Sequence, residues 1–191
     1  MEAAHLGAYF GPFRRTAMNE ALAFLSQTAH FAPDATRWAQ AAFAVRERFS
    51  VVDAGVSVGI PTWSIGSQPP AAFATHIGKY FADSIREDAL LDRATAGVVF
   101  LPGSTGTVQE IFQNAAQNAS VRHHSTPMIF LDEHFWTSEL PVWPLLERLA
   151  TRHSFSDLVW LVDTVEDAVR VLEDSRPHVG HPFAHAQAKV R

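Results

Sequence analysis

The segment from residue 101 to residue 110, LPGSTGTVQE, combines two glycines, three hydroxyl side chains and a carboxylate. It follows a short apolar run and precedes a stretch with helical spacing. Free backbone N–H groups and the helix dipole both favour negative charge where a helix begins after a strand. The candidate phosphate ligands combine backbone freedom with hydroxyl donors: Gly103, Ser104, Thr105, Gly106 and Thr107. The pattern therefore indicates an anion site.

The same segment also has a purely structural interpretation. Thr107 and Glu110 have the spacing of a capping box, in which the carboxylate accepts a backbone N–H. The two glycines would then serve only a tight turn between strand and helix. Neither the G-x-G-x-x-G dinucleotide fingerprint nor the Gly-Lys-Ser/Thr of a Walker loop is present. Spacing alone leaves both interpretations open.

A charged cluster stands upstream, at the start of another predicted helix. Arg86, Glu87 and Asp88 follow one another there. Acidic residues at a helix start favour the dipole, so the simplest interpretation is a solvated helix start. The functional alternative makes Arg86 a clamp for phosphate or ribose oxygens at the carboxyl end of the adjoining strand.

A third candidate is GIPTW at residues 59–63, which ends a predicted strand. The α/β folds bind ligands at this edge of their sheets, so Pro61 and Trp63 are candidate nucleotide contacts. Trp63 could stack on a base. An indole in such a place is more often a half-buried core residue, and this alternative stays open.

The ten histidines do not form a recognisable metal motif. His123 and His124 fall in a predicted loop, and His178, His181 and His185 punctuate the C-terminal stretch. A histidine in a flexible segment lacks the neighbouring groups that orient a metal ligand. We therefore expect no metal site.

Composition narrows the class of protein. Of the 191 residues, 47% are apolar and 18% charged, which excludes a disordered chain. No apolar run approaches the roughly 20 residues needed to span a bilayer. The net charge of −5, without Lys/Arg clusters, argues against nucleic-acid or membrane-surface binding. There is no cysteine, which excludes disulfides and thiolate chemistry. Residues 1–7 lack the basic start of a signal peptide, so we expect a cytoplasmic protein.

The order of predicted elements indicates an α/β fold. Short apolar runs predict about four strands, at residues 54–60, 97–101, 127–131 and 158–162. Helical spacing predicts helices at residues 1–8, 19–29, 34–48, 70–84, 85–93, 105–118, 140–151 and 164–174, with Asp34 and Thr164 as N-caps and a break near Pro144. Strands that alternate with helices predict a parallel sheet with flanking helices. We expect one domain over residues 1–174, with a helical insert at 9–50 and a flexible tail at 175–191.

In combination, these motifs resemble the LOG family of Rossmann-like proteins. Residues 102–110 are similar to the family's Pro-Gly-Gly-x-Gly-Thr-x-x-Glu, and Arg86 to the arginine of its Arg-Lys motif. Ile60-Pro61 is similar to its strand end, and residues 127–131 with Phe135-Trp136 to its next strand and aromatic pair. The resemblance runs from Met1 to about Leu172, and it implies a Rossmann-like sheet.

The resemblance also implies an activity. LOG proteins, long mislabelled as lysine decarboxylases, split nucleoside 5′-monophosphates into free base and ribose 5-phosphate. It implies a phosphoribohydrolase of the AMP nucleosidase or cytokinin-riboside-monophosphate type, with Arg86 and Glu110 as catalytic residues. Residues 103–107 would bind the phosphate, and neither cofactor nor metal would be needed. Family members are usually homodimers or larger oligomers, so we expect the same here.

The chain departs from the family pattern in several places. Ser104 replaces the second glycine, Glu87 replaces the lysine, and the spacing from Arg86 to Pro102 is one residue longer. The resemblance further implies that Met1 lies inside an earlier Gly-rich motif and that two strands are missing. The alternatives are therefore a non-catalytic protein that binds a nucleotide or molybdenum cofactor, and an inactive truncated remnant.

Overall fold

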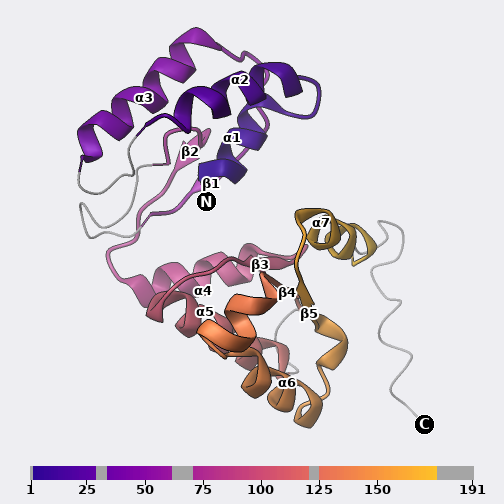
Figure 1. Cartoon of the computed structure of the whole chain (residues 1–191). Helices are drawn as coiled ribbons and strands as arrows, with labels where there is room; N and C mark the ends of the chain where they lie inside the picture. The colour runs from indigo at the N-terminus through magenta and orange to yellow at the C-terminus, as the bar shows by residue number, and fades with distance from the viewer. Residues whose placement is uncertain (1, 29–33, 62–70, 121–124, 176–191) are drawn as a thin grey trace, which may run out of the picture. The chain divides into compact units, whose positions relative to one another are not determined.

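A computed structural model describes residues 2–28, 34–61, 71–120 and 125–175 of the chain (Figure 1). The chain divides into two compact units, Met1–Arg86 and Glu87–Arg191, and each is described by itself. The single domain predicted over residues 1–174 stays a prediction.

The elements of the first unit are α1 (Glu2–Phe10), α2 (Arg15–Leu25), α3 (Ala35–Arg48), β1 (Val58–Gly59), β2 (His76–Ile77) and the first residues of α4 (Asp83–Arg93). The second unit continues α4 and adds β3 (Val98–Phe100), α5 (Thr105–Asn118), β4 (Met128–Leu131), the π-helical turn η1 (Phe135–Glu139), α6 (Trp143–Arg152), the 3₁₀ turn η2 (Ser156–Leu158), β5 (Val159–Val162) and α7 (Val165–Asp174).

Local chemistry sets the boundaries of the N-terminal helices. Gly11 adopts a φ of +66° between α1 and α2, a left-handed conformation that glycine enters without a Cβ clash. Asp34 caps α3, because its carboxylate accepts the N–H of Arg37 at 2.9 Å. The predicted Asp34 cap is confirmed. The predicted helix at 19–29 is displaced, since α2 already begins at Arg15 and ends at Leu25.

The predicted helix at residues 70–84 is wrong over the described residues 71–82. The two-residue strand β2 lies in that stretch and pairs with β1 in parallel, Val58 opposite His76. Thr75 supports this pairing by donating from both its N–H and its hydroxyl to the Ser57 carbonyl, at 3.0 and 2.8 Å. The apolar spacing was misleading because Ile77 and Phe81 are 56% and 84% exposed. Helix α4 starts only at Asp83.

The second unit contains a three-stranded parallel sheet in the order β3-β4-β5. The strands predicted at 97–101, 127–131 and 158–162 are confirmed, and with them the α/β class. The parallel strands form two sheets. Of the strand predicted at residues 54–60, only Val58–Gly59 forms a strand, and this strand, β1, pairs with β2 and not with β3, β4 or β5.

Strand β4 is buried on both faces. Met128 and Phe130 point to one face and join the core formed with α5 and α6, whereas Ile129 points to the opposite face. Helix α7 packs against β4 and β5, and Figure 1 shows it apart from α5 and α6. This burial explains why β4 lacks the polar alternation of a half-exposed strand.

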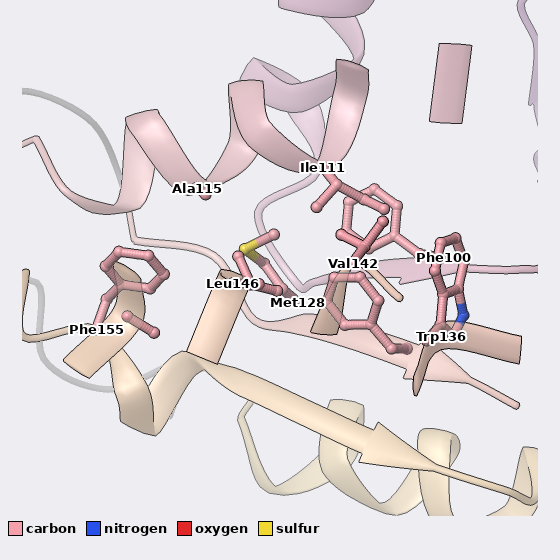
Figure 2. Packing of buried hydrophobic residues seen from close by; sticks show 10 residues of the cluster. Phe100, Ile111, Ala115, Met128, Trp136, Val142, Leu146 and Phe155 are labelled. Carbon is pink, nitrogen blue, oxygen red and sulfur yellow. The ribbon is translucent and has the colours of Figure 1, made fainter. Parts of the chain in front are cut away.

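Figure 2 shows how α5 and α6 close the core over the sheet. The Phe130 ring stacks on Phe100 at 5.0 Å between centroids and meets the edge of Trp136 at 5.5 Å. The indole N–H of Trp136 donates to the Leu131 carbonyl at 3.0 Å, so its polar atom is satisfied. The other buried members of this core are Ile111, Ala115, Met128, Val142, Leu146, Ala150 and Phe155.

Two helix starts in this unit test the sequence predictions. Pro144 lies in the first turn of α6, where its missing N–H costs nothing, so it begins the helix rather than breaking it. Thr164 caps α7 as predicted, because its hydroxyl accepts the Asp167 N–H at 3.1 Å. The same hydroxyl donates to the Asp167 carboxylate and lowers the pKa of that group. Among the described helices, none is long and apolar enough to cross a membrane.

The core predicts different outcomes for two adjacent leucines of α6. Leu146 is fully buried, so Leu146→Ala should lower the free energy of unfolding by about 2–5 kcal/mol. Leu145 is 53% exposed, and Leu145→Ala should change it by about 0.5 kcal/mol or less. Urea denaturation followed by circular dichroism measures both. Equal losses in the two variants would contradict this packing.

Candidate functional site

Helix α5 begins with unused backbone donors. Ser104 is its N-cap, but the Ser104 side chain makes no capping bond, and the first helical bond runs from the Val108 N–H to the Ser104 carbonyl at 3.0 Å. Within the described part of the chain, no group accepts the N–H of Thr105, Gly106 or Thr107. These donors stand at the positive end of the helix dipole, in an exposed turn. They can bind an anion without breaking a hydrogen bond to another described residue of the protein.

The capping-box interpretation of this segment is wrong. Because α5 starts at Thr105, Thr107 is the third residue of the helix rather than its cap. Glu110 lies a further turn along, beyond the first turn whose N–H groups need acceptors. The carboxylate of Glu110 is therefore not required to complete the helix start.

The two glycines of the segment have different surroundings. A Cβ on Gly103 would lie 2.1 Å from the Thr107 hydroxyl and 2.8 Å from the Thr107 Cβ, so the Thr107 side chain covers the Gly103 backbone. A Cβ on Gly106 would meet nothing within 4 Å. Glu110 stands one helical turn beyond Gly106 on the same face and is half-buried. The turn is therefore tight at Gly103 and open beside Gly106, and Glu110 lies on the same face of α5 as Gly106.

The acidic residues of α4 are not simply a solvated helix start. Glu87 is only 3% exposed, and its carboxylate accepts a hydrogen bond from the Gln109 side chain of α5. Asp88 is exposed but accepts a hydrogen bond from Gln113, one turn further along α5. The prediction of a solvated residue is therefore wrong for Glu87. The spacing of residues on α4 could not reveal a hydrogen-bond partner that lies on α5.

Arg86 is the last residue of the first unit, and its side chain is 11% exposed. Its Nη1 donates to the Ile60 carbonyl at 3.4 Å, and its Nε lies 3.7 Å from the Asp83 carboxylate. Ile60 follows β1 and precedes the half-buried Pro61. The structure thus brings Arg86 to the strand end that carries Pro61. Trp63 lies outside the described residues.

His5 belongs to none of the motifs in the sequence. It belongs to α1, and its Nε2 lies 3.5 Å from the position that a Cβ on Gly59 would take. Burial is the main cause that lowers the pKa of His5 and so favours its neutral form. Gly59 itself has no room for a side chain, since a Cβ would come within 2.2 Å of the Ala71 Cβ. No spacing rule in the sequence links His5 to β1.

The described residues include no group of three histidine, aspartate or glutamate side chains that could hold a metal ion. His123, His124 and the C-terminal histidines lie outside those residues.

The comparison with protein families identifies the class of protein. A model of the family described as possible lysine decarboxylase matches residues 41–172, which is more than half of the chain. The chain belongs to this family, which is the one that its motifs resemble under the name LOG. The match includes Pro61, Arg86 and residues 102–110, whereas α1 and α2 precede it. No curated protein is similar enough to this chain to count as a match.

The two glycines predict opposite effects on stability. Gly103→Ala should destabilise the second unit by about 1–3 kcal/mol, because the new methyl group collides with Thr107. Gly106→Ala should stabilise it by about 0.5 kcal/mol, because alanine is the better helix former and has open space. Thermal unfolding by circular dichroism compares them. A Gly106→Ala variant as unstable as Gly103→Ala would refute the assigned geometry.

Proposed function

We propose that this protein is a nucleoside 5′-monophosphate phosphoribohydrolase that releases a free base and ribose 5-phosphate. The observation that carries the proposal is the start of α5, where three backbone N–H groups lack an acceptor among the described residues and Glu110 stands one turn away. Membership of the family supports it. Residues 103–107 would bind the 5′-phosphate through N–H groups and hydroxyls.

Each remaining residue has a role that follows from the chemistry. The bond between C1′ of the ribose and the base nitrogen breaks, and positive charge develops on the sugar. Glu110 would contact the ribose hydroxyls, stabilise this charge, and orient or deprotonate the attacking water. The water oxygen bonds to C1′, and the departing base takes up a proton. Arg86 would hold phosphate or ribose oxygens, since its guanidinium suits both.

The finer points are part of the same proposal. The substrate would be a purine nucleotide such as AMP, with Pro61 and Trp63 near the nucleotide. The reaction needs no cofactor, and the protein would act in the cytoplasm as a homodimer or larger oligomer. These assignments come from the resemblance to LOG proteins.

The family's description names a different reaction, the decarboxylation of lysine. The open N–H groups and hydroxyls of residues 103–107 are hydrogen-bond donors, which fit the oxygens of a phosphate ester. The Glu110 carboxylate fits the cationic transition state of glycoside cleavage. The chemistry of α5 therefore favours the nucleotide reaction over the decarboxylation.

The test is direct. The purified chain is incubated separately with AMP, GMP, IMP, CMP, UMP and L-lysine, and released base or carbon dioxide is measured. We expect base from a nucleotide, and Glu110→Gln should lower kcat at least a hundredfold, because it removes the charge that faces the sugar. Binding of ribose 5-phosphate, measured by calorimetry, should change less than threefold.

Glu147→Gln is the matched control, because Glu147 is an exposed residue of α6 outside the proposed site, and it should retain full activity. Base release that survives Glu110→Gln would sink the assigned mechanism. No base from any nucleotide would overturn the hydrolase itself and leave a non-catalytic nucleotide- or molybdenum-cofactor-binding protein, or an inactive remnant.

A further inference from the structure

Glu87 is a buried charge that the proposed reaction does not use. With 3% of its surface exposed, its carboxylate has lost most of its water, which is unfavourable unless hydrogen bonds replace the lost solvation. The Gln109 side chain of α5 supplies such a bond. An apolar residue could fill this space at lower cost, so the buried carboxylate calls for a specific reason.

A second hydrogen-bonded pair, Asp88 with Gln113, also joins α4 to α5. Glu87 and Asp88 are consecutive on α4, whereas their partners Gln109 and Gln113 are one turn apart on α5. Residues four apart on a helix lie on the same side, about 6 Å apart along the axis. Two bonds at that separation restrain both sliding and rotation of α5 against α4, which one bond could not do.

The apolar contacts of α5 are on another side of the helix. Ile111 and Ala115 pack on the sheet and hold α5 to the core, as Figure 2 shows. Apolar packing tolerates small shifts, whereas hydrogen bonds depend steeply on distance and angle. The hydrogen bonds of Glu87 and Asp88 therefore fix the position and rotation of α5, which its apolar face already holds against the core.

Gln109 is followed directly by Glu110, and Glu87 follows directly after Arg86. We propose that Glu87 is a positioning residue, which acts through Gln109 to hold the turn of α5 that presents Glu110 to the ribose. This inference rests on the proposed function for its effect on catalysis. It assigns no contact between Glu87 and the substrate.

Exchange of the two side chains tests the proposal. Gln109→Glu sets two carboxylates against each other, so kcat should fall ten- to a hundredfold at neutral pH with a small change in KM, because a misplaced group costs rate. The double variant Glu87→Gln/Gln109→Glu restores an amide-to-carboxylate bond in reverse and should return kcat to within threefold of the starting protein.

Gln117→Glu is the matched control, since it makes the same change two turns further along α5 and should leave kcat unchanged. Hydrogen exchange of the residue 105–110 amides is a second readout that needs no activity. It should accelerate in Gln109→Glu and recover in the double variant.

The two readouts separate the two claims. If the unmodified protein releases no base, the proposed function fails, and hydrogen exchange alone decides whether Glu87 holds this turn. Unchanged exchange in Gln109→Glu, or a double variant no better than that single variant in either readout, would overturn the positioning role.

Discussion

The burial of β4 on both faces is the constraint on which the second unit depends. Phe130 packs against Phe100 and Trp136 on one face, and Ile129 is buried on the other. A strand enclosed in this way cannot shift its register by one residue, because every side chain would change faces. Its parallel neighbours are then fixed as well, and β3 delivers the chain to the start of α5 at the carboxyl edge of the sheet, where α/β folds bind ligands.

The start of α5 lacks a side-chain cap. Ser104 is among the best N-cap residues, yet its hydroxyl makes no bond to the helix, whereas Thr164 does cap α7. A missing cap costs about 1 kcal/mol. A bound phosphate would satisfy the same N–H groups and offset this cost. The contact of Thr107 with Gly103 keeps the turn tight, and the space beside Gly106 keeps it accessible.

Elements that depend on neighbouring residues could be predicted from the sequence, and those that depend on distant contacts could not. The cap at Asp34 follows from side-chain chemistry within four residues, and the strands of the second unit follow from unbroken apolar runs. Residues 70–84 have helical spacing, but the hydrogen bonds of Thr75 to Ser57 lie beside a two-residue strand at His76–Ile77 instead. The candidate site shows the same division: its glycine and hydroxyl pattern is visible in the sequence, whereas the burial of Glu87 depends on another helix.

Amide chemical shifts during a titration with ribose 5-phosphate test whether the start of α5 binds a phosphate. The resonances of Thr105, Gly106 and Thr107 should shift together and saturate, because their N–H groups would bind the phosphate. The start of α7 is the internal control, since the Thr164 hydroxyl already accepts the Asp167 N–H there. No response at α5, or an equal response at both helix starts, would contradict a phosphate site at residues 103–107.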